Sequence, residues 1–292
     1  MTITASDVRR HVQRLASEIG ERNVFRFPAL SEAANYIKRE WIEQGYDLVP
    51  QSYEVQGVRC ENLEITRWGR SRRHDLILVG AHYDSVLGSP GADDNASGVA
   101  ALLEISRRVA RAETERSVRF VAFVNEEPPF FYWGQMGSMV YARAARKRGD
   151  DIRLMISLEM LGYYSQLPKS QRYPPFFRFF YPDRANFIAF VSNLRSRRQL
   201  LRAVTIFRAC SDFPLEHVAA LGFIPGISWS DHLSFWRRGY RALMVTDTAF
   251  YRYPYYHTAL DVPDKLDYDA LACVTEGLCK TIAALANDSA KR

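Results

Sequence analysis

The 292-residue sequence has no apolar run approaching the ~20 residues that a membrane-spanning helix needs. Its first ten residues are polar and lack the apolar core of a secretory signal peptide. We therefore expect a cytoplasmic protein without a membrane partner, although a chain trimmed at its start would look the same. The four cysteines have no C-x-x-C spacing, which argues against a thiolate zinc site and favours buried free thiols.

Charge of neither sign dominates, since 39 basic residues stand against 33 acidic ones and give a net charge of +6. The basic residues cluster at Arg70–Arg73, Arg143–Arg148 and Arg195–Arg198. An anionic partner such as nucleic acid would explain these clusters, but no aromatic-interleaved pattern or known nucleic-acid motif accompanies them. We favour a solvated surface and predict no nucleic-acid partner. The sequence leaves the oligomeric state open.

Helical periodicity and continuous apolar runs alternate along the chain. We predict helices at residues 6–19, 31–44, 97–111, 137–148 and 268–287. Apolar runs typical of buried parallel strands cover residues 76–81, 118–124, 154–158 and 242–246. Segments 46–56 and 60–67 alternate in the manner of an antiparallel edge. The pattern predicts an α/β fold, a single three-layer domain over residues 1–292 with a mostly parallel open sheet and helices on both faces.

One stretch, residues 163–184, is loop-like and rich in proline and aromatic residues. It is either a cap over a functional site or an ordinary surface excursion, and the sequence favours neither.

Polar side chains follow three of the predicted buried strands. His82 comes directly after Ala81, the pair Glu126 and Glu127 follows the strand ending at Val124, and Glu159 follows Leu158. In open α/β sheets ligands bind beyond the carboxyl ends of the strands. Imidazole and carboxylate without thiolate suit zinc, with Mn²⁺ or Co²⁺ as substitutes. The sequence therefore predicts a metal site at this edge.

Two ions sharing a site need a bridging carboxylate at a separation of ~3.5–4 Å. Asp94, a short side chain in a glycine-flanked loop, suits that position. The adjacent acids Glu126 and Glu127 suit two different tasks: one binds metal while its neighbour reaches the attacking water as a general base. Most single histidines are structural, and for His232 beside Asp231 we keep both a site role and simple packing open.

These residues resemble the M28 family of zinc peptidases, the co-catalytic two-zinc aminopeptidases. The resemblance covers about residues 75–268, with weaker agreement over 31–63. Its motifs are His82-Tyr83-Asp84-Ser85, the Asp94-Asn95 loop twelve residues after His82, the Glu126-Glu127 pair followed by Gly137-Ser138, Ser230-Asp231-His232, and Tyr256-His257.

The resemblance implies two zinc ions per chain. One would be bound by His82, Asp94 and Glu159. The other would be bound by Asp94, Glu127 and His257, so that Asp94 bridges the two. Glu159 stands where the family usually has Asp, and its extra methylene could loosen the first ion.

The resemblance also implies three catalytic roles. Glu126 would act as the general base. Asp84 would orient His82, as metal-ligating imidazoles generally require. Tyr256 matches a tyrosine that stabilises the oxyanion in some members of the family.

Substrate preference is less constrained. Residues 128–135 form a longer and more aromatic loop than compact aminopeptidases have, and Trp229 replaces an arginine of one family branch. Aromatic residues in loops near the metal edge predict a pocket for a large hydrophobic or aromatic side chain. The candidates are Phe130, Trp133, Trp229 and Tyr251. The alternative is that these rings pack the loops against one another.

Three functions compete at this point. The first is a peptidase that hydrolyses peptide bonds, most simply an aminopeptidase, with carboxypeptidase or dipeptidase as variants. The second is a glutaminyl-cyclase-like acyl transferase with one zinc, because cyclases share the fold and have an aromatic insertion after the Glu pair. The third is a non-catalytic binding domain, which we disfavour because such relatives lose ligands that this chain keeps.

Overall fold

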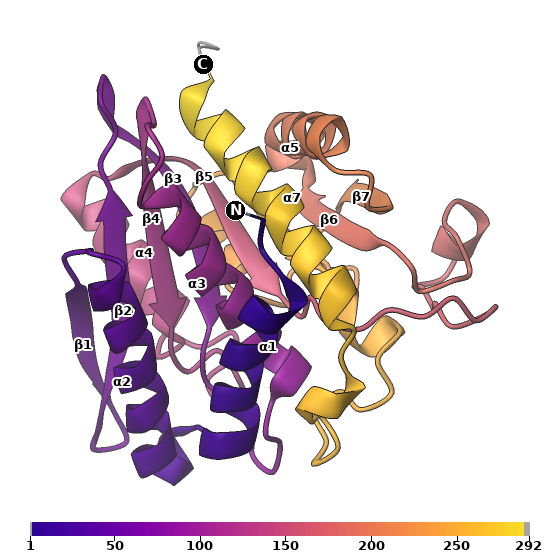
Figure 1. The fold of residues 1–292 in the computed structure, drawn as a ribbon, viewed down its shortest axis with the longest axis horizontal. Helices are drawn as coiled ribbons and strands as arrows, with labels where there is room; N and C mark the ends of the chain where they lie inside the picture. Colours follow the sequence, from indigo (N-terminus) through magenta and orange to yellow (C-terminus); the bar gives the residue numbers. More distant parts are fainter. Residues whose placement is uncertain (1, 289–292) are drawn as a thin grey trace.

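The computed structural model describes residues 2–288, and Figure 1 shows its elements. The strands are β1 (Val49–Val55), β2 (Val58–Arg67), β3 (Arg72–His82), β4 (Arg116–Phe123), β5 (Asp151–Glu159), β6 (Ile188–Asn193), β7 (Leu215–Ala220) and β8 (Ala242–Thr246). The α-helices are α1 (Ala5–Gln13), α2 (Phe27–Glu43), α3 (Gly98–Val109), α4 (Gly137–Arg148), α5 (Arg197–Cys210), α6 (His232–Arg237) and α7 (Tyr268–Asn287). Other helical turns include η1 (Arg14–Ile19) after α1, η3 (Ala92–Ser97) before α3, and η6 (Ala249–Tyr251).

The strands form one sheet in the order β1-β2-β4-β3-β5-β8-β6-β7. The central strands β4, β3, β5 and β8 are parallel to one another. β1 and β2 form the predicted antiparallel edge, and β6 pairs antiparallel with β8 while β7 runs parallel to β6. The predicted α/β domain is confirmed as a mixed sheet whose parallel part lies at its centre.

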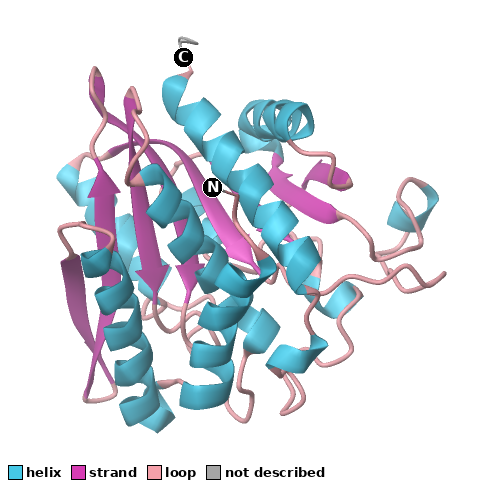
Figure 2. Cartoon of the chain, viewed as in Figure 1, coloured by secondary structure: helices cyan, strands magenta, loops and turns pink. Residues whose placement is uncertain are grey.

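Helices cover both faces of this sheet, as predicted (Figures 1 and 2). Successive side chains of a strand point to opposite faces. Ile77 and Val79 of β3 accordingly join the main core with apolar residues of α1, α2, α3, α5 and α7. Leu76 and Leu78 join a second core with residues of α4 and α6. Each such side chain contributes about 1.5–3 kcal/mol when it is fully buried, and together they hold the central strands rigidly.

The predicted helices are present, but α2 begins at Phe27, four residues before the predicted start. Pro28 occupies its first turn, where a proline needs no partner for its missing N–H group, and this start signal outweighed Ser31 and Glu32. The sequence prediction missed β6, α5 and β7 altogether. β7 is a half-buried edge strand, and such strands lack the continuous apolar run by which the central strands were found.

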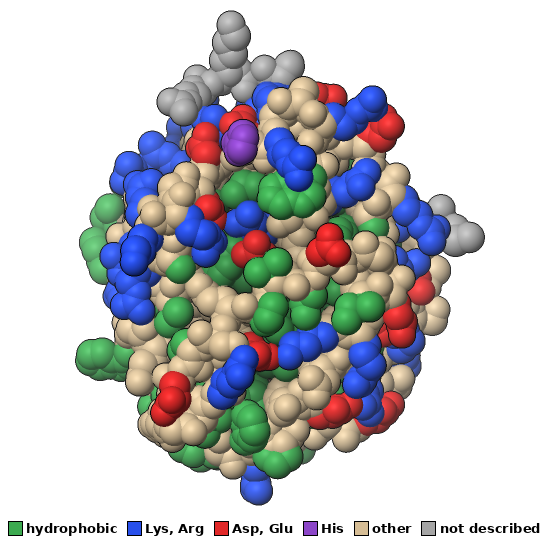
Figure 3. All heavy atoms as spheres, turned by 90° about the vertical axis from the view of Figure 1, so that its left-hand side faces the viewer, with side chains coloured by type: hydrophobic (Ala, Val, Ile, Leu, Met, Phe, Trp, Pro, Cys, Tyr) green, Lys and Arg blue, Asp and Glu red, His purple; other side chains and the backbone are tan. Residues whose placement is uncertain are grey.

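At the amino ends of the central strands lies an open cavity of about 890 Å³, and we call its surroundings the arginine edge. Arginines of all three basic clusters meet here. The arginines that line it are Arg72, Arg116, Arg146, Arg153, Arg195, Arg198, Arg202 and Arg241. On the separate face shown in Figure 3, basic, acidic and hydrophobic side chains are interspersed.

Among residues 2–288, no helix is long and apolar enough to cross a membrane. The four cysteines are free, and Cys60 and Cys279 are buried as predicted. The prediction of buried thiols is wrong for Cys273, which is exposed on the other side of α7, and Cys210 is half-buried.

Candidate active site

The predicted metal ligands come together at the carboxyl ends of the parallel strands. His82 is the last residue of β3 and Glu159 the last of β5, and Glu126 and Glu127 follow β4. Because β4, β3 and β5 are neighbours that run in the same direction, their ends deliver these side chains to one place. We call this place the metal edge.

The turn η3 delivers Asp94 to the same place, directly before α3. A Cβ atom at Gly98 would collide with the Asn95 side chain and with the carbonyl of Leu158. Glycine therefore lets α3 begin against the end of β5. The Asn95 amide donates to the Leu158 carbonyl at 2.8 Å, which fixes this loop to the strand that carries Glu159.

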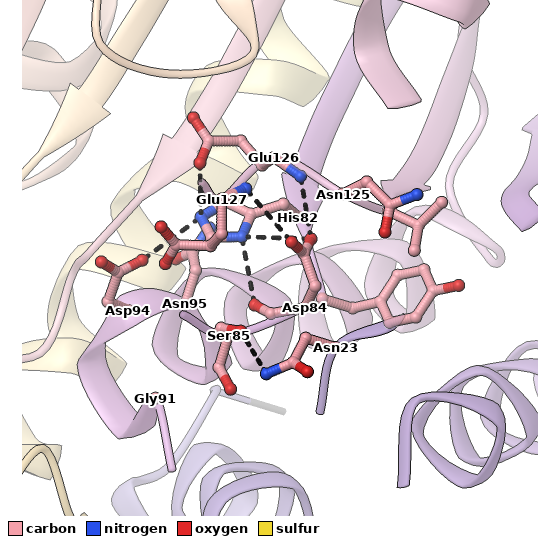
Figure 4. A network of polar contacts seen from close by, with 12 residues as sticks. Asn23, His82, Asp84, Ser85, Gly91, Asp94, Asn95, Asn125, Glu126 and Glu127 are labelled. Carbon is pink, nitrogen blue, oxygen red and sulfur yellow. Dashed lines mark hydrogen bonds and ion pairs between the residues drawn. The ribbon is translucent and has the colours of Figure 1, made fainter. Parts of the chain in front are cut away.

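The ligand atoms fall into two sets that share Asp94; Figure 4 shows Asp94 beside His82 and Glu127. Oδ1 of Asp94 lies 3.3 Å from Nε2 of His82, which also lies 3.4 Å from Oε2 of Glu159. Oδ2 of Asp94 lies 3.1 Å from Nε2 of His257, which also lies 3.2 Å from Oε2 of Glu127. The two oxygens of one carboxylate thus face two different imidazole–carboxylate pairs.

These residues fit divalent cations. Nε2 of His82, Oδ1 of Asp94, Oε1 of Glu127 and Nε2 of His257 are buried atoms that form no hydrogen bond. Ligand atoms of His82, Asp94 and Glu127 also lie within 4.8 Å of one another. A buried polar atom left without a partner costs about 1–3 kcal/mol. Buried lone pairs in this state fit divalent cations, which would accept them.

The pKa values of these groups show how strongly the site disfavours uncompensated negative charge. Burial, with Asp94 close by, raises the pKa of Glu127 to about 8. Burial and the neighbouring carboxylates also hold the pKa of Glu126 well above its ordinary value. Burial would lower the pKa of His257, but the close carboxylates of Asp94 and Glu127 raise it to about 10. Cations are therefore attracted to this edge.

Asp84 holds both His82 and the glutamate pair in place (Figure 4). Its Oδ1 accepts the backbone N–H of Glu126 at 3.1 Å, and its Oδ2 accepts that of Glu127 at 3.2 Å. Nδ1 of His82 lies 3.2 Å from the Asp84 carbonyl and 3.6 Å from Oδ1. The other imidazole nitrogen, Nε2, therefore points to the metal edge.

Asp261, which sequence reasoning missed, holds the Asp94 loop by its backbone, as Asp84 holds the glutamate pair. Its two carboxylate oxygens accept the backbone N–H groups of Asp93 and Asp94, at 2.8 and 3.2 Å. The hydroxyl of Tyr253 donates to Asp261 at 2.8 Å. Asp261 carries no local signal for this role, because the two backbone N–H groups that it accepts lie more than 160 residues away.

Arg22 is a second residue that the sequence did not reveal. Its buried guanidinium donates to the carbonyls of Tyr83, Pro90 and Gly91, in the loop between His82 and Asp94. Burial lowers its pKa to about 10, although Asp261 and Asp84 oppose the change. Arg22 therefore supports the loop backbone, and its positively charged guanidinium lies behind the acidic ligands.

Ser230 and Tyr256 contact individual ligands. Oγ of Ser230 donates to Oε2 of Glu159 at 2.7 Å, which fixes the longer side chain at the position where an aspartate is usual. The Tyr256 ring stacks on the imidazole of His257 with centroids 3.8 Å apart.

Asp231 and His232, which follow Ser230, point in different directions. Asp231 is buried beside this cluster, and burial raises its pKa to about 7. His232 turns away, with Nε2 2.8 Å from the Ile227 carbonyl and its ring against Trp236. For His232 the packing alternative is therefore the one that the structure supports.

A cavity of about 100 Å³ adjoins the metal edge, and its lining includes Glu159, Tyr256, Trp229 and Tyr251. Residues of the excursion 163–184 line it as well, namely Gln171, Tyr173, Pro174, Phe177 and Tyr181. Two other predicted substrate residues lie elsewhere. Phe130 is buried in the main core, and Trp133 is 69% exposed.

The model of peptidase family M28 matches residues 64–282. The chain belongs to peptidase family M28. This M28 peptidase is 37% identical over 276 residues to the Escherichia coli (strain K12) protein "Uncharacterized protein YfbL", which covers 91% of this chain and 84% of that protein. It is 25% identical over 307 residues to leucine aminopeptidase 1 of Ajellomyces capsulatus (strain NAm1 / WU24), covering 94% of this chain and 74% of that protein.

Solved structures show the same fold. BSAP, a zinc aminopeptidase from Bacillus subtilis, matches with a TM-score of 0.79 at 15% identity, over 99% of this chain and 97% of that chain. The Bacteroides thetaiotaomicron glutaminyl cyclase bound to N-acetylhistamine matches with a TM-score of 0.73 at 19% identity, over 97% and 98%. The family membership confirms the predicted enzyme class: the M28 peptidase is a zinc metallopeptidase whose substrates are peptides.

Proposed function

We propose that this M28 peptidase is an aminopeptidase that binds two zinc ions and uses Glu126 as its general base. The observation that carries the proposal is Asp94, whose two oxygens face the His82–Glu159 pair and the His257–Glu127 pair separately. One carboxylate between two imidazole–carboxylate pairs is the arrangement that a bridging ligand requires. Mn²⁺ and Co²⁺ would substitute, since they accept the same ligands.

Zinc bound at this edge would supply Lewis-acid polarisation of the scissile carbonyl and would lower the pKa of water. Glu126 then takes a proton from the attacking water and passes it to the leaving amine. Its raised pKa, caused by burial, suits a group that must hold a proton between these two transfers. Asp84 keeps Glu126 in place through the backbone, and Tyr256 is positioned on His257 to stabilise the oxyanion.

The preference for the amino end rests on charge. The lining of the cavity beside Glu159 includes two glutamates and, within the described residues, no lysine or arginine that could clamp a terminal carboxylate. Arg252 is buried, and it donates to Gln171 and to the Phe187 carbonyl. Arg237 bonds the Tyr132 carbonyl. A terminal ammonium group, in contrast, would find carboxylate acceptors at the metal edge.

The test compares one peptide in free, N-acetylated and C-amidated forms with the zinc-loaded enzyme, while elemental analysis gives the metal content. We expect two zinc ions per chain, and cleavage of the free and amidated peptides but not of the acetylated one. Cleavage that survives acetylation and stops on amidation would instead make the enzyme a carboxypeptidase. Saturation at one zinc, with cyclisation of N-terminal glutamine peptides, would support the glutaminyl-cyclase alternative.

A further inference from the structure

The floor of the cavity beside the metal edge is a row of residues across four neighbouring strands. Glu159 of β5 pairs with Thr246 of β8, Thr246 with Ala189 of β6, and Ala189 with Glu216 of β7. All four line the cavity. Three strand spacings separate the Cα atoms of the two glutamates by roughly 14 Å. The small side chains of Thr246 and Ala189 leave the space between them open.

The walls of this cavity are apolar even where they carry polar residues. The hydroxyls of Tyr173, Tyr181 and Tyr251 donate to the backbone carbonyls of Pro182, His217 and Pro225, so their rings face the cavity. The remaining wall residues are mostly hydrophobic, including Phe177, Phe187, Ile227, Met244 and Phe250.

The polar side chains of Gln171 and Thr248, also in the lining, hydrogen-bond each other. They are therefore not available to a ligand as free polar groups.

Unlike Gln171 and Thr248, the lining carboxylate of Glu216 has no side-chain partner among the described residues; His217, the next lining residue, also has a buried Nδ1 that forms no hydrogen bond. Within the described residues its carboxylate forms no hydrogen bond and no ion pair, although it is half-buried. Burial raises its pKa, and the facing rings of Tyr173 and Tyr181 lie close enough to feel its charge. Arg208 lowers the pKa of Glu216 from a distance but donates to the Leu215 carbonyl at 3.0 Å. A carboxylate in this state lacks a cationic partner.

We propose that Glu216 is a specificity-determining residue that binds the cationic head of an N-terminal lysine or arginine, whose aliphatic stem lies over Thr246 and Ala189. The proposal rests on the proposed function, because it places the scissile bond at Glu159 and the metal edge. Lysine and arginine combine an apolar stem with a charged end, which matches apolar walls that end in one carboxylate. This proposal replaces the sequence-based expectation of a purely hydrophobic pocket with an apolar pocket that ends in one carboxylate.

The size of the cavity agrees with one such side chain. The cavity has a volume of about 100 Å³, and one water needs about 10–15 Å³, so it holds roughly seven to ten water-sized groups. A lysine or arginine side chain has a comparable number of heavy atoms, so one such side chain fits in this volume.

The experiment measures kcat/KM for lysyl, arginyl, Nε-acetyl-lysyl and norleucyl p-nitroanilides. Acetylation removes the charge of lysine, and norleucine keeps the stem without the head. We expect the lysyl and arginyl substrates to exceed the two neutral ones by roughly 10- to 100-fold, the range of a charge-assisted contact. Glu216→Gln should abolish this preference and leave the norleucyl rate within about twofold, as expected for loss of an interaction that only cations make.

Asp183→Asn is the matched control, because Asp183 is an exposed acid of the same excursion that does not line the cavity. It should keep the preference. Calorimetric binding of lysinamide and norleucinamide provides a readout independent of turnover, and only lysinamide should bind more weakly to Glu216→Gln.

Equal rates for lysyl and norleucyl substrates, or a preference that survives Glu216→Gln, would overturn the assignment while leaving the aminopeptidase intact. If no N-terminal substrate is cleaved, the proposed function fails. The amide binding then still decides whether Glu216 holds a cation.

Discussion

The two ends of the central parallel strands carry opposite charge in different ways. At the metal edge, Asp94, Glu126, Glu127 and Glu159 are at most 7% exposed, and Arg22 lies behind the loop as an opposing charge. At the arginine edge, Arg146, Arg195 and Arg198 are exposed to water. Water and salt screen like charges at a surface, whereas buried carboxylates cannot all ionise without a counter-ion.

The acids at the arginine edge also differ from those at the metal edge because arginines pair with them. Asp75 and Asp151 pair with Arg153 at 2.7 and 2.9 Å, and Asp150 pairs with Arg119 at 2.8 Å. Asp288 pairs with Arg202. A cluster of like charges therefore indicates a functional site where the charges are buried and have no partners of opposite sign. The sequence alone does not show whether a charged cluster is buried and unpaired or exposed and paired.

The largest effect should follow from Glu126→Gln, which keeps the shape of the side chain and removes its basic oxygen. We expect kcat to fall by ~10²–10⁴-fold, the usual contribution of a general base, while the zinc content stays unchanged. Steady-state kinetics with elemental analysis checks both. The same acid-to-amide change at the arginine edge, Asp151→Asn, should leave kcat/KM within about twofold. A variant at Glu126 with nearly normal kcat would assign the base elsewhere.

Removing single ligands should change the affinities of the two proposed ions differently. Asp94→Asn should weaken both, because each oxygen faces one imidazole–carboxylate pair, whereas Glu127→Gln should weaken only the ion at His257. We expect each affinity to fall by more than the roughly 10- to 100-fold that loss of an outer partner costs. Titration against a chelating dye measures this. If Glu127→Gln still binds two ions with unchanged affinity, Glu127 is not a ligand.

Stabilisation by zinc should grow with pH. The pKa of Glu127 rises from 4.5 to about 8 on folding, so the metal-free folded state binds the extra proton between these values and loses stability as pH rises through them. The raised pKa of His257, about 10 against 6.5, stabilises the metal-free fold fully below pH 6.5 and less above it. The lowered pKa of Asp94 stabilises the folded state above its ordinary value of 3.8, and this contribution is lost only as the pH falls below that value.

Between pH 6 and pH 8 the metal-free protein should therefore lose Tm, and zinc should restore more of it at pH 8. Each kcal/mol corresponds to about 2–4 °C for a domain of this size class. Scanning calorimetry with and without zinc gives the two differences. A zinc-induced shift that is equal at both pH values would show that these groups do not exchange protons for metal.

The smallest effect should follow from the double variant Arg195→Gln/Arg198→Gln at the arginine edge. These exposed side chains form no ion pair among the described residues, so we expect the free energy of unfolding to change by no more than about 0.5 kcal/mol. Denaturant unfolding and kcat/KM check this together. A tenfold change in activity would contradict the contrast between the two edges.

Several features could be predicted from the sequence because their signals are local. The continuous apolar runs ending at Ala81, Val124 and Leu158 predicted buried parallel strands, and polar residues directly after them could only lie at one edge of the sheet. Short specific segments around His82 and Asp94 carried the family resemblance, which the match to residues 64–282 confirms.

Other features depend on contacts between distant segments. The arrangement of Asp261 on the Asp94 loop, and of Arg22 behind it, joins residues separated by more than 60 positions, so no pattern in either segment announces it. The pocket was only partly anticipated, since Trp229 and Tyr251 line it whereas Phe130 packs in the core. An aromatic side chain suits a pocket and a core equally well by its chemistry.

The sequence by itself determined the α/β class, the metal-type ligands and their place at the carboxyl ends of the strands, because hydrophobic periodicity and side-chain chemistry are properties of the chain. Only the tertiary structure decided which oxygen of Asp94 faces which imidazole, and that Glu216 ends the row that begins at Glu159. The order of strands in a sheet sets these distances. The strand order results from the packing of the helices against the sheet, and it cannot be predicted from residues that are adjacent in the sequence.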